Sequence, residues 1–238
     1  MITICLTTWP RSKERVEYCK QAITSVAYRT KSFGDLRHHV EIVCSIESQE
    51  VSQSAMRDLT DFLFNSTVRW SVKRTPANLG ANLNRVMMGA IWLGADYILL
   101  MDDDYMVPAP LDLSPYCDFL DANQKFAMVR LSWTVIPAGD PRSHWIKFKP
   151  GEIEMPNGGK LLEVDPQSTY FYAQQPHLRR AKFHQEYGWH KEGGNHGEPE
   201  CELNAAIKAG KWRMAASPVQ LFKDCGAVSS ISDVERWA

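Results

Sequence analysis

Three adjacent carboxylates follow an apolar run near the middle of the sequence. Residues 97–105 read Tyr-Ile-Leu-Leu-Met-Asp-Asp-Asp-Tyr, so a buried strand would lead directly into Asp102, Asp103 and Asp104. Like charges this close raise one another's pKa unless a cation or several hydrogen-bond donors neutralise them. In an extended chain Asp102 and Asp104 point to the same side, where they can hold one divalent ion, or one ion and a ribose. With no Cys or paired His nearby, these oxygen ligands favour Mg²⁺ or Mn²⁺, which proteins commonly share with substrate phosphates.

The elements before this cluster must bring it to a site. Apolar strand patterns at 2–6, 39–46, 68–73 and 97–101 alternate with amphipathic helix patterns at 15–28, 52–64 and 82–93. This alternation predicts a doubly wound α/β fold with a mostly parallel sheet. Ligands bind beyond the carboxyl ends of such strands, so the residues that follow them should line one site. The simpler alternative for the three Asp is a solvated turn or a helix N-cap.

The pattern changes after Asp104. Prolines punctuate a stretch whose strand candidates, 126–131 and 170–173, are short. Residues 178–187 and 200–209 are predicted to be helical, the latter opened by Pro199 and closed by Gly210. We therefore expect a mixed C-terminal half with long loops. No linker or repeat divides the chain, which favours a single domain over residues 1–238.

Composition sets limits on partners and compartment. The formal net charge of −1 gives no sign of a polyanion-binding protein or an acidic tail. The six cysteines form no CxxC pair, and we interpret them as reduced thiols. The first apolar run is too short for a signal peptide, and no stretch reaches the roughly 20 apolar residues of a spanning helix. These features predict a soluble cytoplasmic protein.

The acidic cluster resembles the DxD motif of GT-A glycosyltransferases, and more narrowly that of the family 2 type. Four further segments occur in the order of that family. They are Thr7-Thr8-Trp-Pro-Arg11 after the first strand, Glu47 after the second, Asn78-Leu-Gly80-Ala-Asn-Leu-Asn84-Arg85 before the third helix, and Gly197 to Asn204 followed by Gly210-Lys-Trp212. The resemblance covers nearly the whole chain and implies the GT-A fold. It also implies a nucleotide-sugar-binding half at 1–104 and an acceptor-binding half at 105–238.

The resemblance implies roles for particular residues. Donor-binding residues would be Thr7, Thr8, Arg11, Glu47, Asn78, Gly80, Asn84, Arg85, Asp102 and Asp103. The metal ligands would be Asp102, Asp104 and Asp224, the last in a place where family members often have a His. The alternative for Asp224 is a plain loop aspartate. An NxG loop is also an ordinary helix entry, and Glu47 could equally be a surface residue. A UDP-sugar is the expected donor, and Mn²⁺ or Mg²⁺ the expected cofactor.

The family's catalytic base lies at the start of a helix. Here the sequence offers Glu198, Glu200 and Glu202, of which we favour Glu200, with Glu198 second. A carboxylate there would take the proton of the attacking hydroxyl, which implies inversion at the anomeric carbon. The alternative is that these acids only complement the helix dipole.

The acceptor side is expected to include Tyr172, Arg179, Arg180 and Trp189, because aromatic faces stack on sugars and Arg binds phosphate. Core packing and a solvated helix face are the alternative. The processive polymerases' Q-x-x-R-W motif is not present, which favours transfer of a single sugar. The acceptor could be a glycan, a lipid-linked or protein group, or a hydroxymethylated base in DNA, as with some phage enzymes of related type.

Two other functions remain open at this point. One is a nucleotidyltransferase of related fold, which also uses an Asp-held metal. Such enzymes generally begin with a Gly-rich phosphate loop, and the turn at 7–11 has no glycine. The other is a non-catalytic protein that binds a nucleotide sugar.

Overall fold

The computed structural model describes residues 1–8, 12–31, 39–46, 53–66, 70–76, 79–132, 145–193 and 198–225. The helices are α1 (Lys13–Arg29), α2 (Gln53–Phe64), α3 (Leu79–Trp92), α4 (Ser114–Ala122), α5 (Phe183–Tyr187) and α6 (Glu198–Ala209). The strands are β1 (Ile2–Thr8), β2 (Thr30–Lys31), β3 (His39–Ile46), β4 (Trp70–Pro76), β5 (Tyr97–Asp102), β6 (Tyr105–Met106), β7 (Leu111–Asp112), β8 (Phe126–Arg130), β9 (Ile153–Glu154), β10 (Lys160–Glu163), β11 (His177–Arg180), β12 (Arg213–Ala216) and β13 (Lys223–Asp224).

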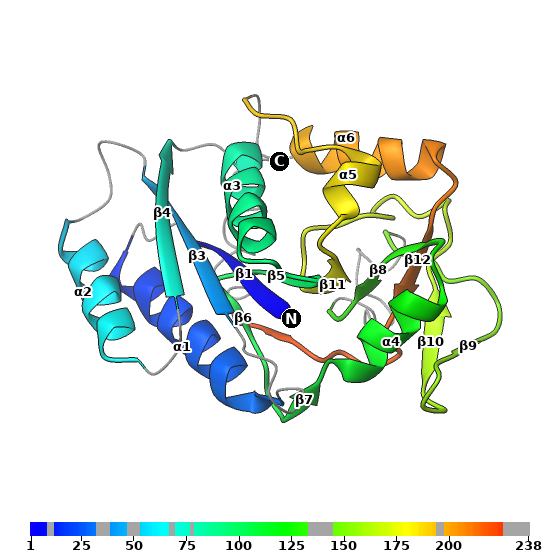
Figure 1. Cartoon of the computed structure of the whole chain (residues 1–238), viewed down its shortest axis with the longest axis horizontal. Coiled ribbons are helices and arrows are strands. Elements are labelled where there is room, and N and C mark those ends of the chain that lie inside the picture. The colour runs from blue at the N-terminus through cyan, green and yellow to red at the C-terminus, as the bar shows by residue number, and fades with distance from the viewer. Residues whose placement is uncertain are drawn as a thin grey trace.

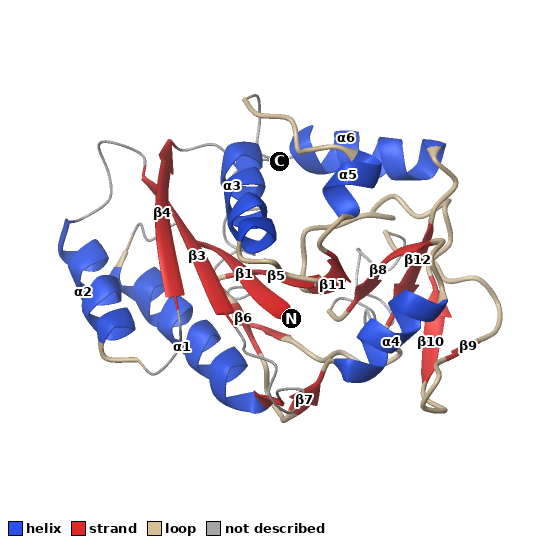
Figure 2. Ribbon diagram, in the orientation of Figure 1, coloured by secondary structure: helices blue, strands red, loops and turns tan. Residues whose placement is uncertain are grey.

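One central sheet joins both halves of the described chain. Its order is β4-β3-β1-β5-β11-β8-β12-β10-β9, seen as one continuous band of strands in Figure 2. The first four strands are parallel, β11 is antiparallel to both β5 and β8, and β8 and β12 run parallel. The predicted α/β fold with a mostly parallel sheet and a mixed C-terminal half is confirmed.

Helices cover both faces of the sheet (Figure 1). On one face, Ile4, Leu6 and Met101 lie in the same core as buried residues of α1, α2 and α4. On the other, Cys5 and Leu100 pack with the buried residues of α3. The side chains of β1 and β5 alternate between the faces because successive residues of a strand point in opposite directions. This alternation decides which side of the sheet each residue of the acidic cluster faces.

Local signals account for the start of α1. The side-chain oxygen of Ser12 accepts the N–H of Arg15 at 3.2 Å, an N-cap that begins the helix. Glu14 in the first turn and Arg29 in the last complement the helix dipole. Arg15, also in the first turn, has the opposite sign from the one that the dipole favours.

Two of the expected elements are wrong. Residues 170–173, predicted as a strand, form turns and bends. Of the predicted helix 178–187, the first part is strand β11, and only Phe183–Tyr187 is helical. The gap between β5 and β8 explains the change, since β11 exchanges backbone hydrogen bonds with both neighbours there.

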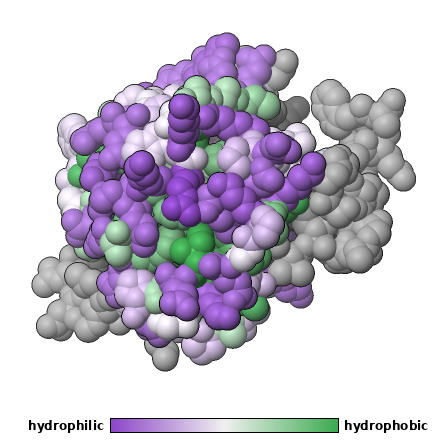
Figure 3. Space-filling model, turned by 90° about the vertical axis from the view of Figure 1, so that its right-hand side faces the viewer, coloured by the Kyte–Doolittle hydropathy of each residue, from purple (hydrophilic) through white to green (hydrophobic). Residues whose placement is uncertain are grey.

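The far edge of the sheet consists of the short strand β9, with charged side chains beside it. Lys160 and Glu152 form an ion pair at 2.5 Å there, and Figure 3 shows this end of the molecule as largely hydrophilic. Charged, short edge strands discourage pairing with another chain. No helix among the described residues combines the length and apolar character needed to cross a membrane.

Candidate active site

The acidic cluster lies where β1 and β5 end side by side. Thr7 and Asp102 are partners in the parallel register, and the Thr7 hydroxyl donates to the Asp102 carboxylate at 2.6 Å. One residue further, the Thr8 hydroxyl donates to Asp103 at 2.5 Å. The structure thus brings together four residues that the sequence assigned to donor binding, at the carboxyl ends of neighbouring strands.

Arg15 neutralises part of the cluster. Its guanidinium lies 2.6 Å from an oxygen of Asp103 and 3.0 Å from an oxygen of Asp104. Asp103 is only 1% exposed and pairs with Arg15 of α1, so its carboxylate is buried on the α1 side of the sheet. Sequence reasoning did not single out Arg15. The available signal was a basic residue in a first helical turn, where the dipole disfavours it.

Asp102 remains in an unfavourable electrostatic position. Burial, followed by the negative charge of Asp104, raises the pKa of Asp102 to about 7, against the opposing hydrogen bond from Thr7. A carboxylate with so high a pKa favours a neutralising partner, as the sequence argument anticipated for like charges at a strand end. This surplus of negative charge, held by hard oxygen atoms, fits a divalent cation.

Asp224 comes close to the cluster through a small two-stranded sheet. Strand β13 pairs antiparallel with β6, which places Asp224 opposite Tyr105, and the N–H of Cys225 donates to the carbonyl of Asp104 at 2.8 Å. Across the described ranges, no three His, Cys, Asp or Glu side chains already form a metal-binding group. Mg²⁺ and Mn²⁺ sites commonly need only one or two carboxylates plus substrate phosphates, so the residues present fit such an ion.

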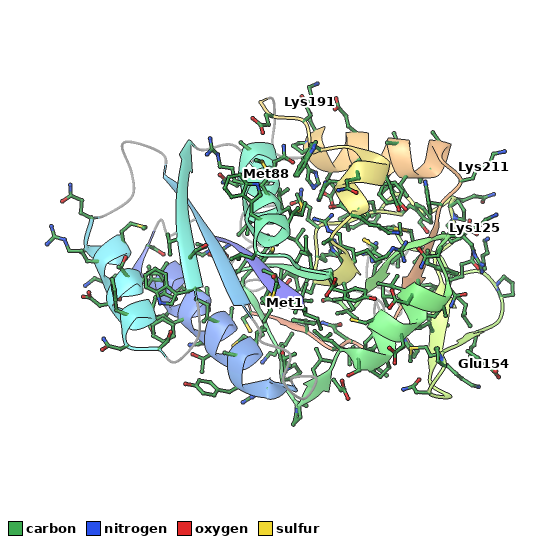
Figure 4. The ribbon with its side chains drawn as sticks, viewed as in Figure 1. Met1, Met88, Lys125, Glu154, Lys191 and Lys211 are labelled. Atoms are coloured by element: carbon green, nitrogen blue, oxygen red, sulfur yellow. The ribbon has the colours of Figure 1, made fainter. Side chains whose placement is uncertain are left out.

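The three candidate bases on α6 have different surroundings. Glu198 and Glu202 extend outward to the ammonium of Lys191, at 3.8 and 2.9 Å. Figure 4 shows Lys191 at the outer edge of the molecule near α5 and α6. Glu200 instead accepts the backbone N–H of Gln174 at 2.9 Å, and burial raises its pKa. Glu200 is therefore the candidate that faces the interior.

The same face of α6 carries other contacts to the segment before β11. One and two turns after Glu200, Asn204 accepts the N–H of Tyr172 at 2.9 Å and Lys208 donates to the carbonyl of Ser168 at 2.8 Å. This spacing of four residues gives Glu200 a structural role alongside any chemical one. A test of Glu200 must therefore keep its hydrogen bond and remove only its charge.

The first two turns of α3 contact residues 190–192. Asn84 accepts the His190 N–H at 2.9 Å and donates to the His190 carbonyl at 2.8 Å. A Cβ on Gly80 would lie 1.9 Å from the carbonyl oxygen of Lys191, so only glycine fits this close approach. Arg85 is exposed on the outer side of α3. Gly80 and Asn84 thus act on a neighbouring segment that sequence reasoning did not connect with them.

The expected acceptor-side residues separate into two places. The Tyr172 hydroxyl lies 3.4 Å from Nε2 of His190, and Arg179 stacks on Phe183 on the same face of the sheet. Trp189 is 47% exposed and stacks on His184, with ring centroids 4.6 Å apart.

Arg180 lies elsewhere, beside Tyr97 at the opposite end of β5 from the cluster. Its guanidinium donates to the carbonyls of Leu120, Gln124 and Phe126 at 2.7 to 3.1 Å. This position does not fit the acceptor-side role expected for Arg180. The predicted donor-binding residues Arg11, Glu47 and Asn78 lie outside the described residues.

A parallel four-stranded half, an antiparallel β11 and an acidic cluster at the end of β5 define the nucleotide-sugar transferase fold known as GT-A. Comparison with solved structures bears this out. A fragment of S. aureus TarS, residues 1–349, superposes with a TM-score of 0.58 at 14% identity, over 93% of this chain and 59% of that one. The mannosyltransferase PcManGT of Pyrobaculum calidifontis gives 0.55 at 12% identity, over 92% and 54%. GalNAc-T7 gives 0.54 at 12% identity, over 92% and 42%.

At 12–14% identity this structural likeness shows the fold alone, and the chain spans less than two thirds of each of these structures. No protein-family model matches the sequence, and no curated protein matches it significantly.

Proposed function

We propose that this chain is a metal-dependent glycosyltransferase that moves one sugar from a nucleotide-sugar donor to an acceptor hydroxyl. The observation that carries the proposal is the acidic cluster itself. Asp102 ends the central strand of a GT-A fold and Asp103 and Asp104 follow it directly, so three carboxylates lie beside the guanidinium of Arg15. Residues 1–104 would bind the donor and residues 105–238 the acceptor.

The solved relatives support the class of donor and cofactor. Solved structures contain TarS with UDP-GlcNAc and with UDP, PcManGT with GDP-Man and Mn²⁺, and GalNAc-T7 with UDP, GalNAc and Mn²⁺. By extension we propose a nucleoside-diphosphate sugar, with UDP-sugars first, and Mn²⁺ or Mg²⁺ for this chain.

Asp102, Asp104 and Asp224 would hold the ion. When bound, it supplies Lewis-acid neutralisation of the charge that develops on the departing diphosphate. Thr7 orients Asp102 through its hydroxyl, and Arg15 keeps Asp103 and Asp104 in place from the α1 side. These contacts preorganise the cluster before a donor arrives, which avoids reorganisation during the reaction.

Glu200 is proposed as the general base. As the acceptor oxygen forms its bond to the anomeric carbon, the bond from that carbon to the diphosphate oxygen breaks, and the acceptor proton passes to the Glu200 carboxylate. Attack from the side opposite the leaving group inverts the anomeric configuration. The Gln174 N–H, which donates to Glu200, fixes the carboxylate in one orientation.

The test is a thermal-shift screen of nucleotide sugars with and without Mn²⁺. We expect one nucleoside-diphosphate family to raise the melting temperature only when the metal is present, since ligand binding stabilises the folded state by mass action. An equal shift without metal would reject the metal role of the cluster.

Transfer assays with the identified donor then follow, on glycan acceptors and on hydroxymethylated DNA. Asp104→Ala should abolish metal-dependent binding. Glu200→Gln, which keeps an acceptor for the Gln174 N–H, should bind donor and transfer nothing. Binding by the unaltered protein with neither transfer nor donor hydrolysis would identify a non-catalytic binding protein instead.

A further inference from the structure

Arg130 is a buried cation that no part of the mechanism above uses. It ends strand β8, is 3% exposed, and lies on the same side of the sheet as α6. Its guanidinium donates to the carbonyl of Tyr170 and to the side-chain oxygen of Gln175, both at 2.7 Å, while its Nε has no hydrogen-bond partner. A buried arginine without a directly bonded carboxylate needs its charge compensated nearby.

The two hydrogen bonds of Arg130 hold residues on both sides of Gln174, whose N–H orients Glu200. Tyr170 and Gln175 lie on either side of Gln174, whose N–H donates to the Glu200 carboxylate at 2.9 Å. The segment 170–175 is made of turns and bends, so its shape depends on such anchors more than a strand would. Arg130 therefore holds the backbone that presents a donor to Glu200.

The positive charge of Arg130 also favours the ionised form of Glu200. Burial raises the pKa of Glu200, and the Gln174 N–H and the Arg130 charge both oppose that rise. Two tyrosines that face Glu200 are uncharged near neutral pH, because burial raises the pKa of Tyr170 and brings that of Tyr172 to about 12. Glu198 and Glu202, on the outer side of α6, pair with the ammonium of Lys191. Across Pro199, burial lowers the pKa of His190 to about 3. Of the groups that shift the pKa of Glu200, Arg130 alone supplies positive charge.

We propose that Arg130 is a positioning residue for the candidate base: it anchors the 170–175 segment and stabilises the negative charge of the Glu200 carboxylate. This inference rests on the proposed function for its catalytic meaning. The electrostatic coupling between Arg130 and Glu200 is a property of the folded chain. It can be measured without any substrate, as the effect of Arg130 on the titration of Glu200.

The experiment compares three variants of the full chain. Arg130→Met removes the charge and both donors, and Arg130→Lys keeps the charge but loses the fork of two bonds. Arg180→Met is the matched control, because Arg180 is also a buried arginine bonded to backbone carbonyls, at the other end of the sheet. The first readout is a carbon-13 NMR titration of the glutamate carboxyl groups, with the Glu200 signal assigned by its loss in Glu200→Gln.

We expect Arg130→Met to move the Glu200 titration to higher pH, while Arg130→Lys and Arg180→Met leave it near its original position. An unchanged Glu200 titration in Arg130→Met would overturn the proposal, and so would an equal displacement in Arg180→Met.

The second readout is the dependence of kcat/KM on pH, with the donor found by thermal shift. For Arg130→Met we expect a loss about tenfold larger at the acidic end of the profile than at the alkaline end. A residue that only supported the fold would lower the rate equally at every pH, and that result would also overturn the proposal. If instead the NMR titration moves but Glu200→Gln still transfers sugar, the coupling stands and the base assignment fails.

Discussion

Replacing Asp102 with Asn should stabilise the metal-free protein while destroying its function. The carboxylate sits beside Asp104 at the end of β5, and its pKa is raised from 3.8 to about 7. This shift of roughly 3 units sets a ceiling of about 4 kcal/mol on the electrostatic penalty, at about 1.36 kcal/mol per unit. Because Asp102 is only partly buried by surface area, solvent screening lowers the gain that we expect to about 1–2 kcal/mol.

The stabilisation that Asp102→Asn brings should depend on pH. The folded protein binds the Asp102 proton more tightly than the unfolded chain, so stability is lost as the pH rises from about 4 to about 7. The advantage of Asp102→Asn should therefore be near zero at the acidic end of this window and complete above it. The amide oxygen of Asn can still accept the Thr7 hydroxyl, which leaves the charge as the main change.

Urea unfolding in the presence of a chelator, repeated at several pH values, measures this effect. Adding Mn²⁺ with a nucleoside diphosphate should stabilise the unaltered protein and leave Asp102→Asn unaffected. A mutant that gains the same free energy at every pH, or that is less stable than the parent at alkaline pH, would refute the reasoning.

Three further substitutions probe ion pairs and close packing within the fold. Arg15→Gln leaves the buried Asp103 without its cation and should cost about 3 kcal/mol in urea unfolding, less when Mn²⁺ is present; an unchanged midpoint would contradict this. Gly80→Ala should cost about 1–3 kcal/mol and speed hydrogen exchange at Lys191, whose carbonyl lies where the new Cβ would be; unchanged exchange would count against it. Glu163→Gln should cost about 1 kcal/mol at neutral pH, and the difference should vanish in acid, since an arginine partner lowers the pKa of Glu163; a constant difference would argue otherwise.

The parallel half of the fold could be predicted because its signals are local. Each strand of β1, β3 and β5 is an apolar run between helix patterns, and the run of three Asp directly after Met101 marks the end of the central strand. In a parallel sheet such ends meet at one edge, so Thr7 and Asp102 could be expected at the same edge, while their pairing in one register is a finding of the structure.

What could not be predicted depends on contacts between distant parts of the chain. The sequence of β11 has helical spacing, and it is a strand only because β5 and β8 each offer it a row of unpaired backbone groups. Arg15 reaches Asp104 across 89 positions, and Arg130 reaches Gln175 across 45. The periodicity of a single sequence does not encode such pairs. The acidic cluster could therefore be located from the sequence, whereas its cation Arg15 and the contact of Arg130 could not.

The antiparallel strand β11 has a mechanical consequence. Strand β11 is hydrogen-bonded to β5 on one side and to β8 on the other. The parallel strands that end at the acidic cluster and the strands of the C-terminal half therefore form one continuous sheet. Hinge motion between the halves would have to break ladder bonds in the middle of the sheet. Any adjustment that admits or releases a ligand is then expected in segments outside these ladders, which include α6 with Glu200 and the 170–175 segment.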